Sequence, residues 1–235
     1  MKILIVNADD FGKTKGINQG IIRAHTKGIV TSTSVMSLQP YADEARNLNV
    51  FPKLSVGLHF DLSDEKIKTR IREKSQLAPE EIIKVRDDFQ NQIAKFQEIT
   101  GRKPDHIDSH YQVHLHDDTK SIFKDYSDKF KIPLRHLSGV NCITNFFAGI
   151  KGVQKTGEGV SPIFLIKTLS ELKDGIYELM CHPGIVDEEL QKVSSYSAGR
   201  EKELETLTNP QVLDQIRKLE IQLKNWQEIH DSLYC

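Results

Sequence analysis

Two adjacent carboxylates, Asp9 and Asp10, follow the first apolar run of the chain, residues 3–8. Neighbouring residues of a regular strand point to opposite faces of a sheet, but where a strand ends the chain turns and both side chains can reach one site. Two carboxylates in one site repel each other unless a positive group lies beside them, and a divalent metal ion is one such group. The pair therefore predicts a metal site, although Asp-Asp-Phe-Gly is also compatible with a solvated turn.

A second group of candidate residues packs four histidines and two aspartates into the short stretch that ends at His116. His106, Asp108 and His110 share one face if this stretch begins as a strand. His110 and His114 would share a face if the chain turns helical after that strand, a spacing that is common in metal sites. We expect a functional role for His114, supported by Asp108 or His110, and a structural or surface role for His106 and His116.

Three further residues stand near the ends of expected strands. His59 lies in an apolar run, where a lone histidine is usually a hydrogen-bonded core residue. Its position at the end of a strand, in the same layer as the other groups, favours its interpretation as a metal ligand. His182 is followed by Pro183 and Gly184, and it is placed either to act as a general acid near neutral pH or to form a plain turn. Arg135 would hold a carboxylate or a substrate oxygen, or form a structural ion pair.

Short apolar runs that alternate with helical patterns must position these residues, and they indicate an α/β fold with parallel strands. Strands are expected at 3–8, 30–37, 54–62, 106–109, 133–137 and 176–181, with 221–226 as either a last strand or the end of a helix. Helices are expected at 16–27, 41–48, 79–100, 117–130, 161–173, 197–208 and 209–219. The rest of the segment 140–175 is rich in glycine and is expected to form loops.

About seven βα units in one chain predict a distorted or incomplete TIM-like (β/α) barrel, with an open doubly wound sheet as the alternative. The barrel is expected to form a single domain over residues 1–235. The candidate residues favour the barrel because they fall at the carboxyl ends of different strands, which converge on one face of a barrel. An open sheet would bring together only those near its switch point.

The composition is that of an ordinary globular protein. Lys and Arg number 32 against 33 Asp and Glu, so the net charge is −1, and no basic excess favours a nucleic-acid partner. The three cysteines are too widely spaced for a disulfide framework or a zinc ribbon. No apolar run has the length of a signal-peptide core or a membrane span. We therefore expect a cytoplasmic protein that acts on a small molecule, without a membrane partner.

Taken together, the motifs resemble the YdjC-like carbohydrate deacetylases, which include a bacterial chitooligosaccharide deacetylase. The resemblance spans nearly the whole chain in order and is carried by IVNADDFG (5–12), GIVTSTS (28–34), VGLHF (56–60), RKPDHIDSH (102–110), VH (113–114) and CHPG (181–184). It implies a distorted β/α barrel that removes the acetyl group from N-acetylated sugars such as chitooligosaccharides or related N-acetylglucosamine derivatives.

The resemblance also implies that Asp10, His59 and His114 bind a divalent metal ion. Mg²⁺ is the usual metal of the family, and Zn²⁺ is the alternative, since imidazole ligands suit zinc whereas magnesium prefers oxygen. Two histidines and one aspartate would leave coordination positions open for water and substrate, as in catalytic sites. A metal ion held in this way polarises a carbonyl group and lowers the pKa of its bound water.

By the same resemblance Asp9 is the general base, His182 is the general acid and Arg135 positions Asp9. The chain departs from the family pattern after His59, where Phe60 leads quickly into a charged helix instead of a longer Thr-rich loop that contains glycine and proline. A shorter loop would open the sugar site.

Two other functions are compatible with these residues. A metal-dependent sugar isomerase on a similar barrel would need more carboxylate ligands at strand ends, and only Glu178, in mid-strand, comes near to this. A non-catalytic sugar-binding protein that kept the fold is the alternative outside enzymes. The sequence leaves open the sugar, its length and the choice between a monomer and a homodimer.

Overall fold

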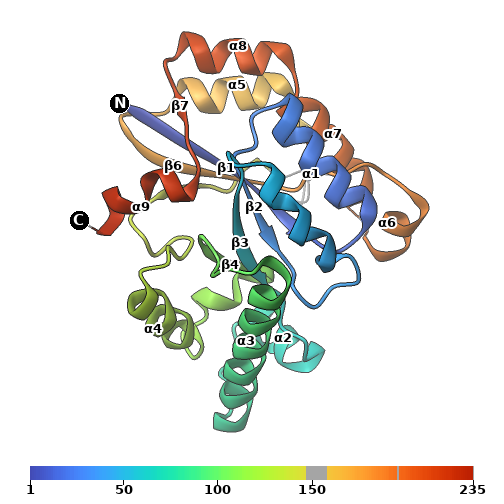
Figure 1. Ribbon diagram of the computed structural model, residues 1–235, viewed down its shortest axis with the longest axis vertical. Helices are drawn as coiled ribbons and strands as arrows, with labels where there is room; N and C mark the ends of the chain where they lie inside the picture. Colours follow the sequence, from blue (N-terminus) through green and yellow to red (C-terminus); the bar gives the residue numbers. More distant parts are fainter. Residues whose placement is uncertain (147–157, 195, 235) are drawn as a thin grey trace.

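A sheet of parallel strands forms the centre of the computed structural model, which describes residues 1–146, 158–194 and 196–234 (Figure 1). The strands are β1 (Lys2–Phe11), β2 (Ser32–Val35), β3 (Ser55–Phe60), β4 (Ile107–Ser109), β5 (Asn141–Ile143), β6 (Gly175–Cys181) and β7 (Gln222–Leu223). Their order is β4-β3-β2-β1-β6-β5, and β7 pairs with the start of β1. The sheet curls into a half-barrel, which confirms the expected incomplete TIM-like (β/α) barrel.

Helices surround the sheet (Figure 1). They are α1 (Lys15–Lys27), α2 (Glu65–Arg72), α3 (Pro79–Thr100), α4 (Lys120–Phe130), α5 (Pro162–Ser170), α6 (Glu188–Val193), α7 (Ser197–Leu207), α8 (Pro210–Lys218) and α9 (Trp226–Tyr234), with 3₁₀ turns η1 (Ala42–Val50), η2 (His110–Leu115) and η3 (Glu158–Val160). α5 packs beside α8, and α1 beside α7 (Figure 1). Within the described ranges, no helix is long and apolar enough to cross a membrane.

Most expected elements are confirmed, but the strand expected at 133–137 is wrong. There the sheet is extended only by one bridge between Leu134 and Ile107. The chain turns directly afterwards, because His136 has a left-handed φ of 64° and the Leu134 N–H donates to Ser138 Oγ at 2.6 Å. The next strand is β5, in the segment expected to form loops. Residues 147–157 of that segment lie outside the described part of the chain.

The two faces of β1 have different partners because side chains alternate along a strand. Leu4 and Val6 belong to the large apolar core beneath the outer helices. Ile3 and Ile5 point the other way and pack against Trp226 of α9 inside the half-barrel. Further along the strand this inner face becomes polar, and the candidate site lies there.

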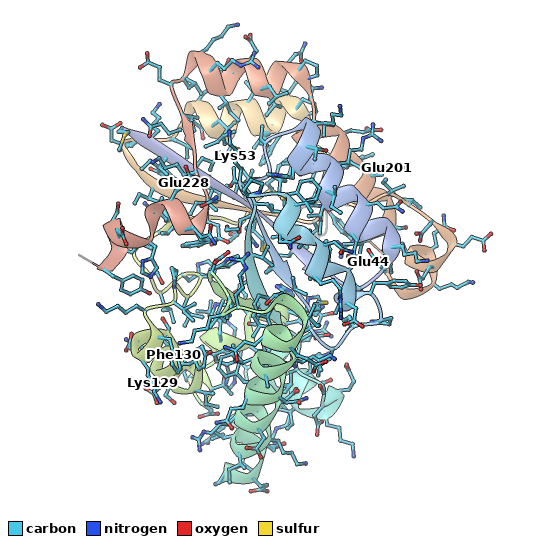
Figure 2. All side chains as sticks on the ribbon, viewed as in Figure 1. Glu44, Lys53, Lys129, Phe130, Glu201 and Glu228 are labelled. Atoms are coloured by element: carbon cyan, nitrogen blue, oxygen red, sulfur yellow. The ribbon has the colours of Figure 1, made fainter. Side chains whose placement is uncertain are left out.

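The start of α1 fixes the loop that follows β1. The Thr14 hydroxyl accepts the Ile17 N–H at 3.2 Å and caps the helix. Asn18 Oδ1 accepts the Gly12 N–H at 2.7 Å, and Asn18 Nδ2 donates to Glu44 Oε2 at 2.8 Å. Glu44 extends from η1 beside α1 (Figure 2). One buried asparagine therefore ties the loop after the acidic pair to a helix and to η1.

Gly20 of α1 provides a test of how this helix packs. A Cβ on Gly20 would lie 2.5 Å from Gly184 Cα, in the loop that follows His182. In a free helix Gly→Ala stabilises by up to about 1 kcal/mol, but here we expect Gly20→Ala to lower the free energy of unfolding by about 1–3 kcal/mol through overpacking. Urea unfolding measures this change. Gln19→Ala, on the exposed side of the same helix, should stay within about 0.5 kcal/mol, and a stabilised Gly20→Ala protein would contradict the packing.

Candidate active site

A bulge in β1 brings both adjacent carboxylates into one site. The pairing of β1 with β2 shifts register between Ala8 and Phe11, and Asp10 has a left-handed φ of 72°. Bulges re-aim side chains in this way, and they are frequent next to active sites. Asp9 and Asp10 are both buried as a result. The change of direction expected at the end of the strand occurs within β1 itself.

Arg135 lies at the centre of a buried group of carboxylates. Its Nη1 and Nη2 donate to the two oxygens of Asp9 at 2.7 and 2.8 Å. It also lies 2.7 Å from Asp108 Oδ2 and 2.8 Å from Glu178 Oε1. Burial alone would lower the pKa of Arg135, but these three carboxylates raise that pKa well above its usual value. The structure thus places Arg135 against Asp9, the residue that Arg135 is expected to position from the resemblance.

His59 is held by Asp108 so that its other nitrogen faces Asp10. His59 Nδ1 lies 2.6 Å from Asp108 Oδ1, and His59 Nε2 lies 3.4 Å from Asp10 Oδ1. Among the described residues neither His59 Nε2 nor Asp10 Oδ1 has a hydrogen-bond partner, although both atoms are buried. Burial lowers the pKa of His59, but the neighbouring carboxylates, Asp108 above all, raise it to about 9. The site therefore favours a positive charge between these two atoms, which a proton or a metal ion can supply.

His110 joins this pair, whereas His114 is engaged elsewhere. Asp10, His59 and His110 each offer one ligand atom, and these atoms lie within 4.8 Å of one another. His114 Nδ1 contacts Ser109 Oγ at 2.6 Å, and its Nε2 contacts a backbone carbonyl oxygen at 3.2 Å. Burial lowers the pKa of His110 to about 4 and that of His114 to about 3, so both rings are neutral at pH 7.

A second group of close ligand atoms in the described chain comprises Asp9, His59 and Asp108. The carboxylates of this group are already neutralised by Arg135, and Asp108 also holds His59 Nδ1. The group with Asp10 instead presents unbonded atoms, one carboxylate oxygen and an imidazole nitrogen, with a second imidazole beside them. This donor set fits a divalent metal ion.

Helix α7 contributes two buried residues that the sequence did not reveal as functional. Arg200 donates to Asp10 Oδ2, and Glu203 accepts the backbone N–H of His182 and the hydroxyl of Tyr196. Burial raises the pKa of Asp10, but Arg200 and then the neighbouring histidines hold it well below its usual value. The spacing of Arg200 and Glu203 places them on one helix face, but nothing in the sequence links that face to Asp10.

His182 lies between the acidic pair and α7. Its Nε2 is 3.9 Å from Asp9 Oδ2, and its Nδ1 is 4.0 Å from Glu203 Oε1. Burial lowers the pKa of His182 to about 4, against the opposing effect of Asp9 and Asp10, so the ring is neutral at pH 7. A general acid at this position must first receive a proton, and Asp9 is placed to supply it.

Three other residues from the sequence analysis, His106, His116 and Glu178, have contacts that indicate structural roles. His106 is completely buried and stacks on Trp226, with ring centroids 5.3 Å apart. His116 is partly buried and lies 3.8 Å from Asp118. Glu178 is occupied by Arg135, so it does not provide the additional metal-facing carboxylate that a sugar isomerase would need.

A half-barrel whose strand ends converge on buried carboxylates and imidazoles is the architecture of a β/α enzyme. A family model described as "YdjC-like protein" matches residues 3–218. The chain belongs to the YdjC-like family, as the resemblance of its motifs predicts. The remaining residues include β7, which pairs with β1 in the same sheet.

Relatives match the chain over nearly its whole length. It is 34% identical to a protein from Thermoanaerobacter pseudethanolicus named carbohydrate deacetylase, over 96% of this chain and 98% of the relative. A crystal structure from Enterococcus faecalis, described as a candidate cellobiose-phosphate cleavage protein, has a TM-score of 0.81 at 28% identity and covers 97% of this chain and 98% of its own. A family 4 acetyl xylan esterase from Clostridium thermocellum, solved with a cobalt ion, shares the fold, with a TM-score of 0.55 at 12% identity over 98% of this chain and 91% of its own.

Glu203 should make the stability of the protein depend on pH. Burial raises its pKa to about 8, against the opposing hydrogen bonds, whereas an unfolded Glu titrates near about 4.3. Because the folded state favours the protonated carboxyl, this stabilisation is complete below about pH 4 and is lost as the pH rises through about 8. Between about pH 5 and 8 the free energy of unfolding of the parent protein should therefore fall as Glu203 loses its proton. In Glu203→Gln, which has no such proton to lose, the fall should be smaller by about 2–4 kcal/mol.

Urea unfolding across this pH range measures the difference. Glu205→Gln, an exposed position of α7, is the matched control and should keep the pH dependence of the parent protein. An unchanged pH dependence in Glu203→Gln would show that Glu203 is not protonated in the folded state.

Proposed function

We propose that the protein is a metal-dependent carbohydrate deacetylase that removes the acetyl group from an N-acetylated sugar. The observation that carries this proposal is the difference between the surroundings of Asp9 and those of Asp10 at the bulge of β1. Asp10 faces two imidazoles with an unbonded oxygen, while Asp9 is held by Arg135. Adjacent carboxylates with such different partners suit metal binding and proton transfer respectively. The relatives named carbohydrate deacetylase support the choice of substrate.

Asp10, His59 and His110 would hold the metal ion, with His110 in the role that the resemblance gives to His114. A metal ion bound there would polarise the acetyl carbonyl and lower the pKa of a water molecule. Mg²⁺ is the metal we propose from the family resemblance, and the two imidazoles also suit Zn²⁺. The cobalt ion in the esterase of the same fold supports a divalent metal in general.

Asp9 accepts the proton of the attacking water. Arg135 binds both of its oxygens, and Asn7 Nδ2 donates to its Oδ1 at 2.8 Å, so the carboxylate is fixed in orientation. The hydroxyl adds to the acetyl carbon, and the C–N bond breaks as the sugar nitrogen takes up a proton. His182, neutral at rest, receives the proton from Asp9 and delivers it to that nitrogen. The hydroxyl of the water thus ends in the acetate product, and its proton ends on the amine.

Acetate release tests this function directly. We expect the protein to release acetate from N-acetylglucosamine or its β-1,4 oligomers, to lose this activity with a chelator and to regain it with a divalent metal. Asp9→Asn should lower the rate by about 10²–10⁴-fold, the usual contribution of a general base, and should keep its metal in elemental analysis because Asp9 is not a proposed ligand.

Each part of the proposal has its own contrary result. Full activity in Asp9→Asn would overturn the role of Asp9, and activity that resists chelation would overturn the metal. A metal-loaded protein that releases no acetate from any acetylated sugar would favour the non-catalytic sugar-binding alternative.

Metal affinity distinguishes His110 from His114. His110→Ala should weaken binding by more than about 10–100-fold, the loss typical of removing even a supporting residue of a metal site. His114→Ala should retain near-parental metal affinity and lose stability instead, because it leaves a cavity and unpairs the Ser109 hydroxyl. Calorimetric titration of chelator-treated protein with Zn²⁺ and Mg²⁺ measures both variants. The reverse pattern would restore His114 as the ligand.

A further inference from the structure

Arg200 is a buried cation that is paired with one carboxylate. It lies on α7, which packs beside α1 (Figure 1), and it is only 3% exposed. Its Nη2 donates to Asp10 Oδ2, and within the described ranges Asp10 is the only carboxylate at ion-pair distance from it. Its Nε and Nη1 are buried and have no hydrogen-bond partner among the same residues. Because a buried charge is costly unless it is well paired, this arrangement indicates that Arg200 acts on Asp10.

The neighbours of Arg200 keep its guanidinium in place without neutralising it. Glu203 follows one turn later on α7, but burial raises its pKa to about 8, so it is mostly protonated at pH 7. The ring of Tyr196 lies 5.9 Å from the guanidinium carbon. A Cβ on Gly184 would lie 3.3 Å from Arg200 Cβ and Cδ, and the Gly184 N–H donates to the Arg200 carbonyl oxygen at 3.2 Å. The loop that contains Gly184 therefore holds the guanidinium in the site.

Arg200 leaves one oxygen of Asp10 for a metal ion. The guanidinium occupies Oδ2, whereas Oδ1 lies 3.4 Å from His59 Nε2 and 3.7 Å from His110 Nδ1. The two imidazoles are neutral when they bind a metal ion. Asp10 is thus the one anionic group among the proposed ligands, and its charge is shared with Arg200.

This sharing of charge has two consequences for a metal ion at Asp10. Where the carboxylate is already balanced by a guanidinium, both positive charges of a divalent ion remain without an anionic partner among the proposed ligands. A buried cation nearby also repels the ion, and this repulsion is strong where little water screens it. The ion is then bound less tightly, but it withdraws more electron density from a carbonyl oxygen or a water molecule.

We propose that Arg200 is a positioning residue that acts through Asp10, weakening the binding of the metal ion and strengthening its action on the acetyl carbonyl. The guanidinium reserves Oδ2, leaves Oδ1 for the metal ion and withdraws negative charge from it. Arg200 would thus lower metal affinity and raise turnover. This inference rests on the proposed function for Asp10 as a ligand and for the reaction.

A purely structural role for Arg200 predicts the opposite effect on metal binding. If the guanidinium only held Asp10 in place, its removal would weaken metal binding, typically by about 10–100-fold for a supporting residue of a metal site. If it withdraws charge, its removal should strengthen metal binding, because the full charge of Asp10 then faces the ion. The direction of the change in metal affinity separates the two roles.

Arg200→Met removes the charge and keeps a flexible, unbranched side chain in the same space. Calorimetric titration of the chelator-treated protein with Zn²⁺ should give binding at least about 10-fold tighter than in the parent. The kcat of acetate release, measured at saturating metal, should fall by roughly 10-fold or more. Arg200→Lys restores a cation and should return both values toward those of the parent. Lys202→Gln, exposed on the same helix, is the matched control and should change neither.

Thermal unfolding covers the case in which Arg200→Met folds poorly without metal, since Asp10 then lacks its cation. A bound metal ion replaces the missing charge, so Zn²⁺ should raise the Tm of Arg200→Met more than that of the parent. Weaker metal binding in Arg200→Met, an unchanged kcat, or a metal-induced rise in Tm no larger than that of the parent would overturn the inference. A parent protein that binds metal and releases no acetate would overturn the proposed function, and the affinity comparison would still decide how Arg200 acts on Asp10.

Discussion

The buried guanidinium of Arg135 is the interaction on which the arrangement of the site depends. It contacts Asp108 on β4 and Glu178 on β6 as well as Asp9 on β1. In a flat sheet β4 and β6 would lie four strand spacings apart, about 19 Å, whereas Arg135 is within 2.8 Å of carboxylates from both. Only a curled sheet permits this contact. Removing one member of such a group leaves uncompensated buried charge, at a typical cost of about 3–5 kcal/mol, so curvature and charge pairing support each other.

Charge pairing also explains how neighbouring residues acquire different chemistry. Asp9 is neutralised by Arg135, whereas Asp10 meets Arg200 from α7 on one oxygen and two imidazoles on the other. Glu203 is the opposite case, since its burial outweighs the groups that would stabilise its charge and its pKa rises. Burial also raises the pKa of Glu178 to about 6 although Arg135 lies beside it, so a nearby cation outweighs burial at Asp10 but not at Glu178 or Glu203.

Local patterns in the sequence predict the elements well where periodicity and termini agree. The helix over 79–100 starts at Pro79 and ends before Gly101, whose φ of 71° provides the left-handed cap. The strand expected over 133–137 has suitable apolar residues, but His136 turns the chain after a single bridge. Arg200 reaches the site only because α7 packs beside α1, and no local pattern encodes that packing. Residues on strand ends were therefore predictable as candidates, and those on a distant helix were not.

The different surroundings of His110 and His114 show what a four-residue spacing alone does not determine. A four-residue spacing places two histidines on one face only if the intervening chain is right-handed and helical. Here Tyr111 and Gln112 are both left-handed, with φ of 54° and 56°, and neither is glycine. Such conformations cost on the order of 1–2 kcal/mol per residue, and they persist where surrounding contacts hold them, often at functional sites. The contacts of the Tyr111 ring with His110 and with the guanidinium of Arg72 are of this kind, so the left-handed backbone at Tyr111 and Gln112 is linked directly to His110 of the candidate site.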